Sequence, residues 1–164
     1  MATTRPVTAL PGAPSVGGRR RADVELRIPA DGAFASVLRT TAAGLAARLD
    51  FTIEDIEDLR IAVGEAHALA LDHASPAGDL TCGFELAPGQ ITVVVSAPVE
   101  AAPALDRDSF AWQVLTTLAT SADLQVDEGV LSVSMTLSSS APTSPTTSPG
   151  PTGEEDADDG PHAG

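Results

Sequence analysis

The sequence predicts an α/β two-layer sandwich, in which helices cover one face of a mixed, mostly antiparallel sheet. The first observation is the order of the patterns along the chain: strand, helix, helix, strand, strand, helix, strand, strand. The second is a pair of short turn sequences, each between two β-rich runs. These turns are Ala87-Pro88-Gly89-Gln90 and Asp127-Glu128-Gly129. Helices interspersed with hairpins are typical of this architecture.

The first strand and the first helix follow from apolar spacing. Residues Val24–Ile28 alternate as a short strand that ends at Pro29. The Ala-rich segment Ala33–Leu49 is predicted to be an amphipathic helix. Its apolar stripe is expected to contain Phe34, Val37, Leu38, Leu45 and Leu49.

A long helix is predicted over Thr52–Ala74. Thr52 is a candidate N-cap, and Glu54 and Asp55 favour the positive end of the helix dipole. The helix is expected to stop near Ser75-Pro76, because proline cannot continue it.

The remaining elements complete the sheet and add one helix. The chain should fold as a helix from Ser109, its candidate cap, to Ala122. The remaining strands are predicted at Leu80–Leu86, Ile91–Ser96, Leu124–Val126 and Val130–Leu137.

The folded domain is predicted to cover residues 22–137, with a tail on each side. Residues 1–21 are rich in Pro and Gly and have no apolar periodicity, and residues 138–164 are Ser/Thr/Pro/Gly-rich and then acidic. Neither segment has enough apolar area to offset the loss of chain entropy, so both tails are expected to be disordered.

The charge of the chain limits its partners. The net charge is −14, and residues 22–137 hold five arginines against eighteen acidic residues, with no lysine. An acidic surface repels phosphate backbones, so we expect no direct nucleic-acid binding and favour a basic protein partner. No apolar run approaches the ~20 residues of a membrane span. With no signal peptide either, we expect a cytoplasmic protein without membrane contact.

No metal or disulfide site is indicated. Cys82 is the single cysteine and lies in an apolar run, where it is interpreted as a small buried hydrophobic residue. His67 and His73 are six residues apart, which does not place them on one helical face, so they do not predict a metal site.

The long helix carries the most specific motif of the chain. Residues Asp58–Ala66 read DLRIAVGEA, and Asp72-His73-Ala74 follow. Over residues 24–137 the chain resembles the small anti-sigma-factor kinases of bacteria, which belong to the ATPase superfamily of histidine kinases and Hsp90. The resemblance implies the histidine-kinase-like ATPase fold. In that family this helix reads DLRLAVxEAxxNxxxHA, where the glutamate is the general base and the asparagine holds magnesium.

By this match Glu65 is the general base, but Leu69 stands at the asparagine position and has no oxygen for a magnesium ion. Two further family elements are missing. The D-x-G-x-G turn that binds adenine is replaced by residues 96–102, which contain neither aspartate nor glycine, and the Gly-rich lid by a segment without glycine between Ala101 and Ala122. Asp106 and Asp108 would repel phosphate there. We therefore interpret Glu65 as vestigial and expect no cofactor.

Two groups of residues are candidates for partner binding. The acidic face of the long helix is either a sigma-factor contact or a means of dipole compensation and solubility. It contains Glu54, Asp55, Glu57 and Asp58. Phe110 and Trp112 stand where the lid would be, and they either fill the vacated pocket or form an exposed anchor for a partner.

These observations favour an anti-sigma regulatory factor without kinase activity. The resemblance implies that such a protein sequesters an alternative sigma factor, is released by partner switching with an anti-anti-sigma antagonist, and is a possible homodimer. The alternative is an active serine/threonine kinase that uses ATP and magnesium to phosphorylate its antagonist. A third hypothesis is a regulatory domain that binds a small molecule in the old pocket.

Overall fold

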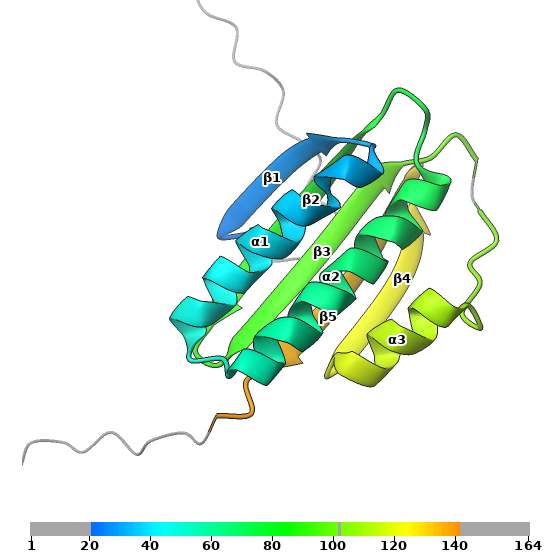
Figure 1. Ribbon diagram of the computed structural model, residues 1–164. Helices are drawn as coiled ribbons and strands as arrows, with labels where there is room; N and C mark the ends of the chain where they lie inside the picture. The colour runs from blue at the N-terminus through cyan, green and yellow to red at the C-terminus, as the bar shows by residue number, and fades with distance from the viewer. Residues whose placement is uncertain (1–20, 102, 142–164) are drawn as a thin grey trace, which may run out of the picture.

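Five strands form one antiparallel sheet in a computed structural model, which describes residues 21–101 and 103–141. The strand order is β1-β2-β3-β5-β4 (Figure 1). The strands are β1 (Val24–Pro29), β2 (Asp79–Ala87), β3 (Gln90–Pro98), β4 (Ser121–Asp127) and β5 (Val130–Ser138). Every neighbouring pair in this part of the chain is antiparallel, so the predicted two-layer class is confirmed but the sheet is not mixed.

The α-helices of the described residues cover one face of the sheet (Figure 1). They are α1 (Ala35–Ala46), α2 (Ile53–His73) and α3 (Phe110–Leu118), with short 3-10 turns at Gly32–Phe34 and Ala47–Leu49. The long helix α2 lies between the other two and packs against both. None of the helices in the described ranges is long and apolar enough to cross a membrane.

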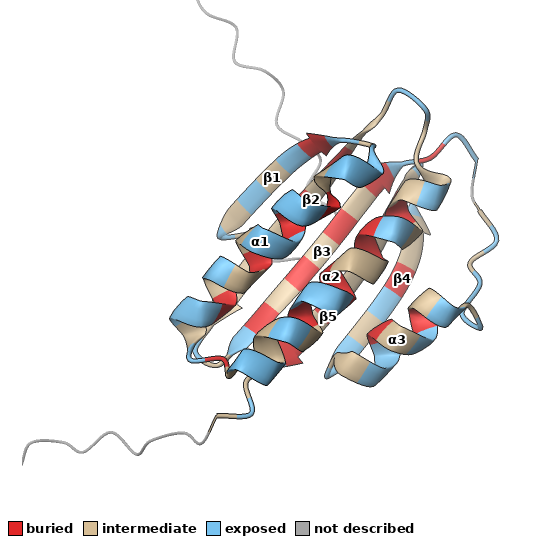
Figure 2. Cartoon of the chain, viewed as in Figure 1, coloured by how far each residue is buried: buried red, intermediate tan, exposed pale blue. Residues whose placement is uncertain are grey.

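The core lies between the two layers. Alternate residues of the central strands are buried under the helices, such as Ile91, Val93 and Val95 of β3 (Figure 2). The alternating residues Thr92, Val94 and Ser96 face away from the helices, and two of these three, Thr92 and Ser96, are polar. Cys82 is buried in β2, as expected, and burial raises the pKa of its thiol to about 12.

The predicted stripe of α1 is confirmed except at one residue, because Leu38 is buried and Phe34, Leu45 and Leu49 pack against the core. Val37 is 44% exposed, and the fully buried side chains of this helix are Leu38, Ala42 and Ala46. These residues recur every four positions, so they form one helical face. Val37 is one position away from this face, so it lies at the edge of the helix and stays exposed.

The helix α2 begins and ends as its sequence predicts. Thr52 and Asp55 form a capping box, in which each side chain accepts a hydrogen bond from the backbone of the other. The helix ends at His73, and Ala74 is extended. By contrast, α3 ends at Leu118 instead of Ala122.

The end of α3 is set by the sheet. Ala119 is extended, and the N–H of Thr120 donates a hydrogen bond of 2.8 Å to the carbonyl of Thr136 in β5. Of the residues predicted to continue the helix, Ser121 and Ala122 therefore belong to β4, because pairing with β5 satisfies their backbone groups. The predicted tails fall mostly on residues 1–20 and 142–164, which lie outside the described residues.

Candidate functional site

The motif residues Glu65 and Leu69 lie one turn apart on α2, so they share one face of the helix. Both are partly buried, and Leu69 packs against the hydrophobic core. Within the described ranges the Glu65 carboxylate has no hydrogen bond or ion pair. Instead it lines a groove between α1 and α2.

This groove, which we call the α1–α2 groove, has a volume of about 400 Å³. Its lining residues are Arg39 of α1 and Glu57, Arg60, Ile61, Gly64, Glu65 and Ala68 of α2. Gly64 leaves room for Arg39, because a Cβ atom at position 64 would lie 3.2 Å from the Arg39 Nε. Arg39 lies outside the motif and Gly64 stands at its variable position, so no sequence pattern indicates that they meet.

The residues around Glu65 do not fit a magnesium site of the related kind. Leu69 contributes only carbon atoms at the position where an oxygen ligand would be needed. In the part of the chain that the structure describes, no group of three or more His, Cys, Asp or Glu side chains could hold a metal ion.

Asp55 has a structural role besides its charge. Its Oδ2 atom accepts hydrogen bonds from the backbone N–H of Thr52 at 3.0 Å and of Ser140 at 2.9 Å, and from the Ser140 hydroxyl at 3.1 Å. Partial burial alone would raise the pKa of Asp55, but these hydrogen bonds outweigh it and lower the pKa from 3.8 to about 2. Asp55 therefore joins the start of α2 to the segment after β5.

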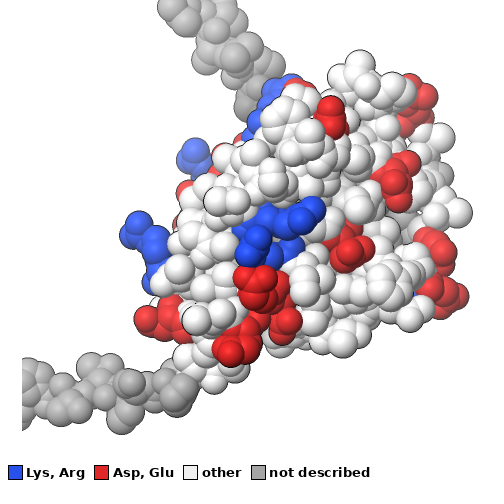
Figure 3. Space-filling view, in the orientation of Figure 1, with Lys and Arg blue, Asp and Glu red and all other residues white. Residues whose placement is uncertain are grey.

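The other three acidic residues of the predicted face remain on the surface. Glu57 pairs with Arg60 at 2.8 Å, and both side chains are exposed. Glu54 is exposed and Asp58 is partly exposed. Figure 3 shows the acidic surface near the N-terminal end of α2, next to arginine surface over the middle of the α1–α2 pair. The four residues thus gather at one end of the helix, but they are not equivalent.

The segment before α3 is held against β4 by Arg107. The Arg107 Nη2 atom donates a hydrogen bond of 2.9 Å to the Leu124 carbonyl, and its guanidinium lies 5.3 Å from the centre of the Trp112 ring. Ser109 caps α3 by accepting from the Trp112 N–H. Side-chain contacts therefore fix this segment at the place where the related lid would bind phosphate.

Phe110 and Trp112 have different roles. Trp112 is 7% exposed and belongs to the hydrophobic core, whereas Phe110 is 77% exposed. Only Trp112 therefore fills space inside the fold. Phe110 remains a candidate anchor on the surface.

His67 is the buried polar residue that sequence reasoning missed, because it was considered only together with His73. It is 2% exposed, and its Nε2 atom has no hydrogen-bond partner among the described residues. Burial lowers the pKa of His67, and the nearby Arg39 charge lowers it further, while Asp31 acts in the opposite direction.

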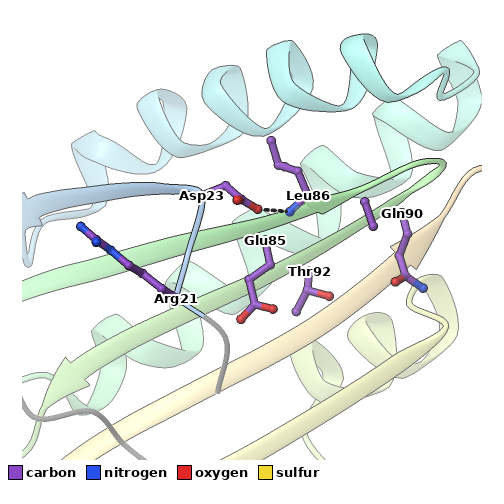
Figure 4. A pocket seen from close by; sticks show the side chains of 7 residues that line it. Arg21, Asp23, Glu85, Leu86, Gln90 and Thr92 are labelled. Carbon is purple, nitrogen blue, oxygen red and sulfur yellow. Dashed lines mark hydrogen bonds between the residues drawn. The ribbon is translucent and has the colours of Figure 1, made fainter. Parts of the chain in front are cut away.

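A second pocket, of about 500 Å³, lies at the β2–β3 hairpin. Figure 4 shows Glu85 and Thr92 in it, together with Asp23, whose carboxylate accepts a hydrogen bond of 2.7 Å from the Leu86 N–H. Thr92 lies on the face of the sheet away from the helices, so this pocket is separate from the motif on α2.

Comparison with known proteins confirms the relationship that the α2 motif indicates. No family model matches the chain. Its relatives include the "Serine-protein kinase RsbW" of Halalkalibacterium halodurans, which is 35% identical over 88 residues, or 53% of this chain and 52% of the relative. The protein of the same name from Bacillus velezensis is 36% identical over 76 residues, 44% and 48% of the two chains. The chain thus spans about half the length of these relatives.

A longer match has lower identity. The Bacillus licheniformis protein of the same name is 28% identical over 141 residues, or 72% of this chain and 87% of the relative. Among solved structures, the RsbU and RsbW domains of Rv1364c from Mycobacterium tuberculosis match with a TM-score of 0.56 and 17% identity, over 71% of this chain and 31% of that one. This structure shows the shared fold. The chain is therefore similar in sequence to proteins named as RsbW serine-protein kinases.

Proposed function

We propose that this chain is an anti-sigma regulatory factor that sequesters an alternative sigma factor without kinase activity. It is released when an anti-anti-sigma antagonist competes for it. The relationship to RsbW proteins supports the general class. The observation that carries the loss of kinase activity is Leu69, which packs against the core one turn after Glu65.

The reason is chemical. Magnesium needs oxygen ligands in near-octahedral geometry, and leucine offers none. A nucleotide triphosphate also needs closely spaced backbone N–H groups, which glycine-rich loops provide. Here the corresponding segment has no glycine and is held to β4 by Arg107. ATP and magnesium therefore do not fit this site, and no catalytic step is assigned to Glu65.

Sequestration needs a surface rather than a pocket. The acidic end of α2 complements a basic sigma-factor surface, and the exposed residues Glu54, Glu57 and Asp58 are its contacts in this proposal. Asp55 adds charge there but is engaged in the cap. Release follows from mutually exclusive binding, so the switch depends on the difference between the affinities of the two partners. Dimer formation stays a prediction.

Ligand-dependent melting tests the nucleotide part of the proposal. Millimolar Mg-ATP should leave the melting temperature unchanged, because only a ligand of the native state raises it. Leu69→Asn restores the metal ligand but neither the adenine-binding turn nor the Gly-rich lid. Mg-ATP should therefore leave the melting temperature of this variant unchanged as well. A rise in melting temperature for the unaltered chain, or phosphate transfer to an anti-anti-sigma protein, would overturn the absence of kinase activity.

Charge reversal tests the partner surface. The triple variant E54K/E57K/D58K leaves the Asp55 cap intact and should weaken sigma-factor binding and reduce its salt dependence. The control D72K/E100K/D127K makes the same charge change at exposed positions outside this end of α2. If calorimetry gives the two variants equal affinities for the sigma factor, the acidic end of α2 is not part of the binding surface.

The active kinase is the second candidate, because the relatives are named as serine-protein kinases. In a kinase Glu65→Gln would abolish phosphate transfer, since the general base is lost. In the proposed factor the same change should leave sigma-factor affinity intact. Measuring both transfer and binding on one variant therefore separates the two functions.

A further inference from the structure

Two arginine side chains converge on the α1–α2 groove of this strongly acidic protein. Arg39 is exposed, and no hydrogen bond or ion pair engages its side chain within residues 21–101 and 103–141. Arg60 pairs with Glu57 through Nη1 and is 46% exposed. Gly64 keeps the space beside Arg39 open. Both guanidinium groups therefore have N–H groups that can donate hydrogen bonds to a ligand in the groove.

Guanidinium donors select for carboxylates. A guanidinium carries five N–H donors in a planar fork that matches a carboxylate or phosphate. Two such groups in one groove favour a short peptide with several carboxylates. Glu57 and Glu65 line the same groove, so binding of an anion there needs a high local concentration.

The chain itself contains such a peptide. Residues 154–159 read EEDADD and hold five carboxylates, and no arginine or lysine occurs from 142 to 164. The described structure ends beside α2, where the Ser139 hydroxyl donates to the Asp50 carbonyl at 2.8 Å and the Ser140 N–H donates to Asp55. Asp55 and Arg60 are five residues apart, about 7.5 Å along the helix axis.

The segment between the described structure and the acidic run is long enough for the run to reach the α1–α2 groove. Twelve residues lie between Ala141 and Glu154, and the thirteen residue-to-residue steps that join them span up to about 43 Å when fully extended. We propose that the acidic run Glu154–Asp159 binds in the α1–α2 groove, with its carboxylates paired to Arg39 and Arg60. Because the run is tethered, its effective concentration reaches roughly the millimolar range, which supports a weak contact. This contact is independent of the proposed function, since it needs neither a sigma factor nor ATP.

The test compares two full-length chains. One is unaltered, and the other carries E154Q/E155Q/D156N/D158N/D159N. The NMR signals of the Arg39 and Arg60 Nε–Hε groups should differ between them, while that of Arg48, exposed near the end of α1, should not. The difference should disappear at about 1 M salt, where charges are screened within about 3 Å. Identical signals of Arg39 and Arg60 in both chains would overturn the proposal.

A peptide added in trans gives a second readout. Fluorescein-labelled peptide 150–164 should bind the neutralised chain, and R39Q/R60Q should weaken that binding by about tenfold because charge-assisted contacts are lost. The matched control R48Q should change it less than about twofold. Binding to the unaltered chain should be weaker than to the neutralised chain, because its own tail competes. If the peptide binds the R39Q/R60Q and R48Q variants with equal affinity, it binds outside the α1–α2 groove and the proposal is refuted.

Discussion

Removal of the Asp55 carboxylate should destabilise the fold, because it holds two distant parts of the chain together. Asp55 completes the capping box with Thr52 and accepts two hydrogen bonds from Ser140, which follows β5. In Asp55→Ala the first turn of α2 loses this link to the segment after β5. The exposed neighbour Glu54 in the same turn supplies the matched control, Glu54→Ala.

The lowered pKa gives the size of the effect. A pKa of about 2 against 3.8 is a difference of about 1.8 units, and at about 1.4 kcal/mol per unit this sets a ceiling of about 2.5 kcal/mol. Asp55 is partly exposed, so solvent screening reduces the contribution to about 1 kcal/mol. A lost N-terminal cap costs a similar amount, about 1 kcal/mol, through the same hydrogen bonds. We therefore expect D55A to lose about 1 kcal/mol more than E54A at neutral pH.

The sign of the pH dependence follows from linkage. The folded pKa is lowered, so the stabilisation is complete above about pH 3.8 and is lost as the pH falls towards 2. Urea unfolding, followed by the fluorescence of the single Trp112, measures the free energy of unfolding. An NMR titration of the Asp55 carboxyl carbon measures its pKa. Equal stabilities of D55A and E54A, or titration of Asp55 near its ordinary value, would refute this account of the cap.

Four further substitutions test the core and the groove. Because burial lowers the pKa of His67, the free energy of unfolding should rise with pH up to about 6.5. His67→Leu should remove this pH dependence. If urea unfolding of the variant shows the same pH dependence as the unaltered chain, the pH dependence does not come from His67. Trp112→Ala should lower the free energy of unfolding by about 3–5 kcal/mol and Phe110→Ala by less than about 0.5 kcal/mol, measured by circular dichroism. Similar losses in the two variants would mean that Phe110 is also a core residue. Gly64→Ala should stabilise the protein by about 0.5–1 kcal/mol, because alanine favours a helix more than glycine and the flexible Arg39 side chain can move away from the new methyl group. A lower melting temperature of this variant would show that the Arg39 side chain cannot move.

Local sequence signals were sufficient for the order of elements and for most of their ends. Thr52 was recognisable as a cap because an N-cap acts on residues three positions away, and Asp55 lies at that distance. The turn at Asp127-Glu128-Gly129 was recognisable because positive φ angles favour glycine, and Gly129 has φ +76°. In both cases the cause lies within a few residues of the signal.

Contacts between distant residues could not be read in this way. Residues 119–122 favour a helix by composition, but pairing with Thr136 in β5 makes them extended. The Asp55–Ser140 hydrogen bonds join residues 85 positions apart, so the sequence predicts a dipole or surface-charge role for Asp55 but not this contact. The meeting of Arg39 and Gly64 depends on how α1 packs against α2, which spacing within either helix does not define.

The proposed absence of kinase activity implies that ligand residues are replaced while the fold is kept, and both have a common physical basis. A polar group held in a partly buried site without its ligand costs about 1–3 kcal/mol, whereas a leucine packed against the core is favourable because it removes apolar area from water. Leu69 and Trp112 contribute apolar packing at places where a nucleotide site would need polar atoms or open backbone. In a protein that acts through its surface, such replacements stabilise the scaffold without a functional cost. If the proposed factor acts through its surface alone, apolar residues packed at the position of a nucleotide site are therefore the expected outcome.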